Sequence, residues 1–204
     1  MSLRVGVLAS GRGSNLQAIL DAAAHPDYPA RVVVVISDRE RATALERAAA
    51  AGVPALFLNP KDHADRDAYD AALVDALRAH AVGLVCLAGF MRILSPAFVR
   101  AFEGRILNVH PSLLPAFPGL SPHRQVLEHG VRVSGATVHF VETGVDTGPI
   151  VLQAAVPVEP GDTEATLAAR VLVEEHRLYP AAVRLFAEHR LEISGRRVIV
   201  KERA

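Results

Sequence analysis

The chain has 204 residues, half of them hydrophobic, and its 22 Lys and Arg residues balance 22 Asp and Glu residues. A neutral chain lacks the basic excess of a broad nucleic-acid or anionic-membrane surface, and half hydrophobic content excludes wholesale disorder. A single cysteine excludes an intramolecular disulfide framework and a cysteine-based zinc site, so we expect a cytosolic protein.

The first half of the sequence alternates apolar strands with helices. Strands are predicted over residues 4–9, 31–37, 53–58 and 82–88, and helices over residues 14–24, 42–51 and 62–80. The strands are rich in β-branched residues and show no strict apolar–polar alternation. Such strands, separated by helices, predict a parallel sheet covered on both faces. The apolar runs are far shorter than the roughly 18 to 20 residues that span a bilayer, so no membrane association is expected.

The pattern changes in the second half. The expected elements are a helix over 95–102, a strand over 104–109, a proline-rich loop over 111–118, paired antiparallel strands over 131–141 and 149–158, a long helix from a cap at Asp162 to about residue 189, and a small hairpin strand within 191–201. We therefore predict one α/β domain over residues 1–204. Its sheet is mostly parallel, Rossmann-like and flanked by helices, with an antiparallel extension in the C-terminal half. Residues 1–103 form a nucleotide-binding-like half, and residues 104–204 complete the site.

A glycine-rich segment, residues 10–15, follows the first strand and opens the first helix. Exposed N–H groups and the helix dipole make such a turn an anion site, and Gly11 and Gly13 let the backbone approach a phosphate. The dinucleotide fingerprint requires glycine where Leu16 stands, although Asp38 resembles the acidic residue that binds a ribose. Phosphate binding, dinucleotide binding and a tight turn without a ligand all remain open from these residues.

Asn108 and His110 are candidate catalytic residues. Side chains two apart in a strand share a face, and ligands of open α/β sheets bind at the carboxyl ends of the strands. Histidine moves a proton near neutral pH, and both side chains can donate to a developing oxyanion. The alternative for His110 is a histidine that merely satisfies its hydrogen bonds at a strand end. Cys86 lies inside an apolar strand and is interpreted as an inert buried thiol rather than a nucleophile.

Asp146 lies in a glycine-rich loop between two predicted strands. A carboxylate beside a histidine favours the imidazolium and fixes its orientation. Taken alone, Asp146 is better explained as a turn residue. The nine histidines show no His-Glu-x-x-His or similar spacing, so no catalytic metal is predicted.

Four sequence blocks carry a family resemblance. They are Gly11-Arg-Gly-Ser-Asn15, Leu87-Ala-Gly-Phe-Met-Arg-Ile-Leu94, Asn108-Val-His-Pro-Ser-Leu-Leu-Pro115 and Asp146-Thr-Gly-Pro149. Together, and in this order, they closely resemble the phosphoribosylglycinamide formyltransferase family of purine biosynthesis, a branch of the folate-dependent formyltransferases. The resemblance implies transfer of the formyl group of 10-formyltetrahydrofolate to the amine of glycinamide ribonucleotide. It implies small-molecule partners and leaves monomer and homodimer open.

The resemblance also implies residue roles. Asn108 and protonated His110 would stabilise the oxyanion, with Asp146 supporting His110. Gly13, Ser14, Asn15 and Glu175 would bind the ribonucleotide, the first three at its phosphate and the last at its ribose. Contacts to the formyl folate would come from Arg66, Met91, Arg92, Ile93, Leu94, Asn108, Glu142, Thr143, Gly144, Val145 and Asp146. Without the family, Arg66 and Glu175 are ordinary exposed helix charges, and residues 91–94 are a core-facing connector.

Ser121 stands where the family often has a histidine. Other functions remain as alternatives at this level. Within the class, a formyltetrahydrofolate hydrolase and a methionyl-tRNA formyltransferase share the core, but both are expected to carry a further domain. From other classes, an NAD-linked oxidoreductase would use Asp38, and a non-catalytic module would bind a phosphorylated sugar without turnover.

Overall fold

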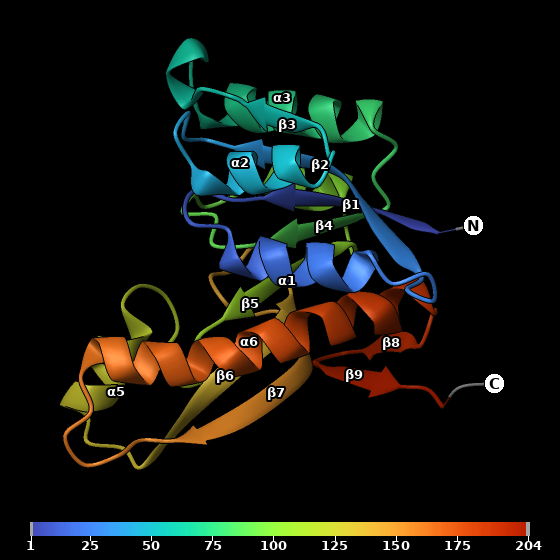
Figure 1. Ribbon diagram of the computed structural model, residues 1–204. Helices are drawn as coiled ribbons and strands as arrows, with labels where there is room; N and C mark the ends of the chain where they lie inside the picture. The colour runs from blue at the N-terminus through green and yellow to red at the C-terminus, as the bar shows by residue number, and fades with distance from the viewer. Residues whose placement is uncertain (1, 203–204) are drawn as a thin grey trace. The chain divides into compact units, whose positions relative to one another are not determined.

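The computed structural model describes residues 2–202, which form an α/β fold with a mostly parallel sheet flanked by helices and antiparallel strands toward the C-terminus (Figure 1). The chain separates into two compact units, residues 1–108 and residues 109–204. The boundary falls inside one strand, so Asn108 closes the first unit and His110 lies at the start of the second.

The first unit is a parallel sheet with its connecting helices (Figure 1). Its elements are β1 (Leu3–Leu8), α1 (Ser14–Ala23), β2 (Ala30–Ser37), α2 (Thr43–Ala50), β3 (Ala55–Phe57), the 3₁₀ helix η1 (Pro60–Asp62), α3 (Arg66–Ala79), β4 (Leu84–Leu87), α4 (Pro96–Ala101) and β5 (Ile106–His110). The strand order is β3-β2-β1-β4-β5, and every pairing is parallel. This arrangement confirms the parallel sheet predicted from the strand composition.

Helix α3 shows how the sequence builds this unit. Tyr69, Leu73 and Leu77 recur at helical spacing and are fully buried, as their pattern predicts. The helix begins four residues later than expected. Asp65 accepts a hydrogen bond from the N–H of Ala68 and caps it, while residues 60–62 form η1.

The second unit contains α5 (Pro122–Glu128), β6 (Val133–Phe140), β7 (Ile150–Pro157), α6 (Glu164–Ala187), β8 (Leu191–Ser194) and β9 (Arg197–Val200). The strand order is β6-β7-β9-β8. Strands β6 and β7 are antiparallel, as are β8 and β9, whereas β7 and β9 are parallel. Helix α6 packs along β6 and β7 (Figure 1). No helix within residues 2–202 has the length and apolarity to cross a membrane.

Two expectations for this unit are corrected, and one helix was not predicted. Thr163, not Asp162, caps α6, because the Asp162 carboxylate instead pairs with Arg170 at 2.8 Å. Helix α5 was not predicted, since a seven-residue helix after a proline-rich loop carries little periodic signal. The tail forms a two-stranded hairpin rather than one strand.

Candidate active site

In the second unit, the carboxylate of Asp146 lies between two histidines. Oδ2 is 3.3 Å from Nδ1 of His110, and Oδ1 is 3.6 Å from Nε2 of His139. The backbone N–H of Gly119 also donates to Oδ2, at 2.8 Å. Burial acts to raise the pKa of Asp146, but the His139 contact, the Gly119 hydrogen bond and the charges of both histidines outweigh it and hold that pKa below its ordinary value. Asp146 is therefore the anion of this cluster at neutral pH.

The backbone conformation of the loop orients the carboxylate of Asp146. Asp146 adopts a left-handed conformation with φ of 53°, which a non-glycine residue rarely occupies. Nearby, a Cβ on Gly148 would overlap the Phe140 carbonyl, so the loop passes too close to β6 for any side chain at that position. The strained turn places the carboxylate between the histidines. Asp146 is therefore more than a turn residue, the alternative that the sequence left open.

His110 has an oxygen acceptor at both ring nitrogens. Its Nε2 lies 2.9 Å from the carbonyl oxygen of Phe117, and its Nδ1 faces Asp146. A carbonyl oxygen only accepts, so Nε2 carries a hydrogen. The side chain is 7% exposed, and Asn108, half-buried, follows the same face of β5 by strand alternation. The ring is thus oriented by two contacts, one to backbone and one to the carboxylate.

His139 is a member of this cluster that the sequence reading missed. It is 2% exposed, and its Nδ1 lies 2.8 Å from the carbonyl oxygen of Phe140. The register of β6 against β7 shifts between Val138 and His139, and such a bulge redirects a side chain. The available signal was the spacing of Thr137 and His139, two polar residues two apart in a largely buried strand.

The proline-rich loop beside His110 is held by buried hydrogen bonds. Thr137 Oγ1 donates to the carbonyl of Ser112 at 2.7 Å and accepts from the N–H of Leu114 at 3.0 Å. The Gln153 side-chain amide donates to Thr137 Oγ1 and to the Leu114 carbonyl, at 2.9 and 2.8 Å. These bonds fix the segment that leads to Phe117, and sequence spacing alone did not indicate them.

His123 lies in the first turn of α5. Burial is the main cause that lowers its pKa, and the charge of His110 lowers it further, against the opposite effect of Glu164. His123 therefore stays neutral near pH 7. Ser121, at the position where the family often has histidine, is exposed, has φ of 54° and makes no side-chain cap to α5.

In the first unit, the glycine-rich loop enters α1 through Gly13. Its φ is 69°, and an added Cβ would stand 2.8 Å from both Cα and Cβ of Ala44. The Ala44 N–H donates to the Gly11 carbonyl at 3.1 Å, and the Arg47 Nε donates to the Arg12 carbonyl at 2.8 Å. Helix α2 thus braces the loop, while Ser14 and Asn15 open α1.

The first turn of α1 contains no acidic residue, and no side chain hydrogen bond caps the helix. The N–H groups that open an α-helix have no partner within the helix. Together with the positive end of the helix dipole they suit an anion such as a phosphate. This helix start is compatible with the phosphate contacts predicted for residues 13, 14 and 15, which stay a prediction.

Residues 89–94 also belong to the first unit and contact the end of β1. The N–H of Met91 donates to Ser10 Oγ at 2.9 Å. Met91 and Ile93 are each 64% exposed, whereas Leu94 is buried. The expectation of a core-facing connector is therefore wrong for Met91 and Ile93. Arg92 is half-buried, with Cζ 5.0 Å from the centroid of the Tyr69 ring.

The remaining predicted residues divide by exposure. Arg66 is 52% exposed at the start of α3, with Asp67 4.0 Å away. Glu175 is only 7% exposed on α6, so the alternative of an ordinary exposed helix charge is wrong for it. Residues 142–145 are exposed in the loop that leads to Asp146.

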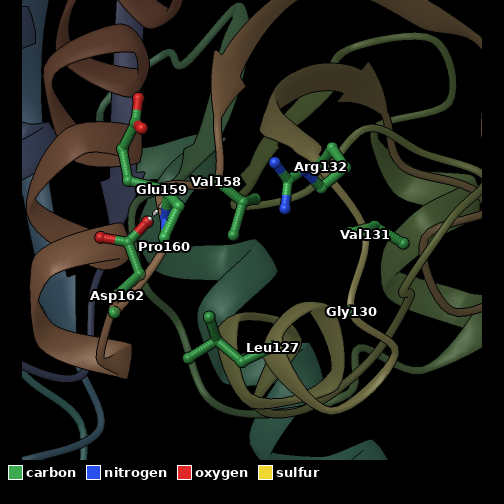
Figure 2. A pocket seen from close by; sticks show the side chains of 9 residues that line it. Leu127, Gly130, Val131, Arg132, Val158, Glu159, Pro160 and Asp162 are labelled. Carbon is green, nitrogen blue, oxygen red and sulfur yellow. Dashed lines mark hydrogen bonds between the residues drawn. The ribbon is translucent and has the colours of Figure 1, made fainter.

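A separate hollow of the second unit is lined by Leu127, Gly130, Val131, Arg132, Val158, Glu159, Pro160, Gly161 and Asp162 (Figure 2). None of the predicted site residues lines this hollow. Among residues 2–202, no group of three or more His, Cys, Asp and Glu side chains could hold a metal ion.

Comparison with known proteins gives consistent matches over most of the chain. Residues 3–183 match the formyl transferase family model. The phosphoribosylglycinamide formyltransferase of Mycobacterium tuberculosis (strain ATCC 25618 / H37Rv) is 53% identical over 95% of this chain and 89% of its own length. The glycinamide ribonucleotide transformylase 1 of Symbiobacterium toebii, a crystal structure, is 60% identical with a TM-score of 0.97, covering 98% of this chain and 95% of that one.

A longer human relative, the trifunctional purine biosynthetic protein adenosine-3, is 47% identical over 98% of this chain. The chain spans only about a fifth of the length of such trifunctional relatives, 20% for the human protein and 18% for that of Bos taurus. The family match and the bacterial relative of similar length together show that the chain belongs to the phosphoribosylglycinamide formyltransferase family.

Proposed function

We propose that this chain transfers the formyl group of 10-formyltetrahydrofolate to the amine of glycinamide ribonucleotide, a step of purine biosynthesis. The observation that carries the proposal is the contact of 3.3 Å between Nδ1 of His110 and the ionised carboxylate of Asp146. His110 lies on β5, the strand that also holds Asn108. Relatives of similar length are named for this activity. The pattern supports acyl transfer because the transition state of that reaction develops negative charge on oxygen.

The reaction proceeds by direct transfer. The amine nitrogen of the ribonucleotide attacks the formyl carbon, and the carbonyl electrons move to the formyl oxygen. The resulting tetrahedral intermediate collapses by cleavage of the bond between the formyl carbon and N10 of the folate. One proton leaves the attacking amine and one reaches N10, so the products are formylated ribonucleotide and tetrahydrofolate. No covalent enzyme intermediate is needed.

The side chains divide this work. Asn108 donates its amide N–H to the oxyanion, and protonated His110 places positive charge beside it and moves the proton. Because Nε2 of His110 already donates to the Phe117 carbonyl, we assign the catalytic proton to Nδ1, on the side of Asp146. Asp146 stabilises the imidazolium and orients the ring, as a buried carboxylate does in other histidine-based sites.

Substrate binding uses the remaining predicted residues. We assign the ribonucleotide phosphate to the amides at Gly13, Ser14 and Asn15, and its ribose hydroxyls to Glu175. We assign the formyl folate to Arg66, to residues 91–94 and to residues 142–146. The exposure of Met91 and Ile93 supports a ligand-facing role, since apolar side chains in a purely structural connector would turn toward the core.

We further propose that the chain works as one formyltransferase domain in the cytosol, with small molecules as its only partners in the reaction. No step is assigned to a metal, so exhaustive chelation is expected to leave turnover unchanged. Light scattering of the purified protein would decide between monomer and homodimer.

The test is turnover of purified protein with 10-formyltetrahydrofolate, followed by absorbance, with and without glycinamide ribonucleotide. We expect turnover only with the ribonucleotide, and a loss of about 10²- to 10³-fold in His110→Ala. Equal turnover without the ribonucleotide would make the chain a formylfolate hydrolase. Absence of turnover with both substrates present would contradict the proposal.

A further inference from the structure

Ser112 is a buried serine that directly follows the catalytic strand and Pro111. Its side chain is fully buried, and Oγ lies 2.6 Å from the carbonyl oxygen of Ala116 and 3.2 Å from that of Phe117. Both carbonyls belong to the proline-rich loop, so the single hydroxyl hydrogen is shared across the end of that loop. Ser112 therefore helps to determine where the Phe117 carbonyl points.

The Phe117 carbonyl is also the acceptor for Nε2 of His110, at 2.9 Å. Phe117 has φ of 55°, a left-handed conformation that is unfavourable for an aromatic residue. Such a conformation persists only where surrounding contacts impose it. The same carbonyl thus receives the serine hydroxyl and the imidazole N–H, and it is presented by a strained residue.

This arrangement defines the rotation of the His110 ring. A ring held at Nε2 by a fixed carbonyl turns its other nitrogen, Nδ1, toward Asp146. If the carbonyl swings away, the ring loses one of its two orienting contacts and can rotate about its side-chain torsions. A displacement of about 1 Å at a catalytic group can cost about 10²-fold in rate.

We propose that Ser112 is a positioning residue for the formyl-transfer reaction. It holds the Phe117 carbonyl where that oxygen accepts the Nε2 hydrogen of His110 and directs Nδ1 to Asp146. The inference rests on the proposed function for its kinetic consequence, but not for its claim about the ring. A serine that only closed the turn between residues 112 and 116 would affect folding without any dependence on His110.

The kinetic test compares Ser112→Ala with a matched control, Ser134→Ala. Ser134 lies on β6, is 1% exposed, and its Oγ has no hydrogen-bond partner among the described residues. Both variants remove one buried hydroxyl from the second unit. We expect Ser112→Ala to lower kcat about 10- to 100-fold with KM for both substrates changed less than about twofold. Ser134→Ala is expected to keep the wild-type kcat.

A double-mutant cycle then separates positioning from structure. If Ser112 acts through His110, Ser112→Ala lowers kcat less than about twofold in a His110→Ala background. An equal loss in both backgrounds, or a wild-type kcat in Ser112→Ala, would overturn the proposal.

The ring itself provides a measurement that needs no activity. Long-range proton–nitrogen NMR spectra of ¹⁵N-labelled protein report which imidazole nitrogen carries hydrogen, and the His110→Ala spectrum identifies the His110 signals. We expect Nε2 to carry hydrogen at every pH in the wild type and in Ser134→Ala, and to lose it in part in Ser112→Ala when the ring is neutral. A wild-type Nε2 without hydrogen would refute the proposal even if Ser112→Ala does not fold. Absent ribonucleotide-dependent turnover in the wild type would refute the proposed function, and the spectra alone would then decide the role of Ser112.

Discussion

The two units carry their candidate sites by different physical means. The loop over residues 10–15 is a candidate backbone site, built within a few residues of sequence at the start of α1. The cluster around Asp146 is a side-chain site, to which β5, the segment over residues 117–119, β6 and the loop after β6 all contribute. The first site depends on the conformation of one glycine, whereas the second depends on charge and hydrogen bonds between distant residues.

This difference determines how each site can fail. A backbone site that presents N–H groups to a phosphate binds substrate and transition state alike, so damage to it raises KM. A charge cluster that stabilises a developing oxyanion acts only in the transition state, so damage to it lowers kcat. Substitutions in the two units therefore distinguish the two kinds of site.

The largest effect is expected for Asp146→Asn. The amide keeps the size of the side chain but removes the negative charge that supports His110, so kcat is expected to fall about 10²- to 10³-fold with little change in KM. Steady-state kinetics measure this effect. Asp162→Asn is the control, since it removes a carboxylate paired with Arg170 outside the cluster and is expected to keep the wild-type kcat. Equal losses in both variants would show that the effect of Asp146 is not specific.

The backbone site is tested by three glycines that differ in their surroundings. At Gly11 an added Cβ would stand in open space. At Gly52 it would also stand in open space, but the backbone φ of 69° is unfavourable for a residue with a side chain. At Gly13 the same φ of 69° is combined with close contact to Ala44. The loss of unfolding free energy is expected to be near zero for Gly11→Ala and about 1–2 kcal/mol for Gly52→Ala. For Gly13→Ala crowding adds about 1–3 kcal/mol, and KM for the ribonucleotide rises. Urea unfolding and kinetics check both expectations. A stable Gly13→Ala with unchanged KM would remove the loop from the binding site.

The two candidate sites could be predicted from the sequence to different extents. The parallel sheet and the loop at Gly13 were predictable, because strand composition and a glycine at a helix start act over short sequence distances. The cluster was only partly predictable. Strand alternation placed Asn108 and His110 on one face, but their link to Asp146 came from the family resemblance. His139 was missed, because a bulge between strands redirects it and no local pattern marks that shift. Helix α5 was missed because seven residues carry little periodic signal, and the Asp162–Arg170 pair because sequence spacing does not show which side chains meet.

A smaller effect is expected where Arg92 lies over Tyr69. A guanidinium above an aromatic face is worth about 0.5–2 kcal/mol, so Tyr69→Leu should raise KM for the formyl folate by about 2- to 30-fold. Tyr69→Phe keeps the ring and is expected to retain the wild-type KM. It removes a buried hydroxyl that has no hydrogen-bond partner within residues 2–202, so urea unfolding should show no loss of stability. Equal KM values for the Leu and Phe variants would exclude a contribution of the ring to Arg92.

The smallest expected effect is a pH dependence of stability, which distinguishes Asp146 in the second unit from Gly13 in the first. The folded-state pKa of Asp146 lies below its ordinary value because the contacts from His139, Gly119 and His110 together outweigh burial. A carboxyl group with a lowered folded-state pKa stabilises the protein fully above its unfolded-state pKa of about 3.9, and this contribution disappears as the pH falls through the folded-state pKa. The stability difference between wild type and Asp146→Asn should thus be present at neutral pH and shrink below about pH 4. The difference between wild type and Gly13→Ala involves no titrating group and should keep one value across that range. Urea unfolding of the three proteins at each pH measures both differences, and parallel pH curves for the two variants would contradict an ionised Asp146 in the folded second unit.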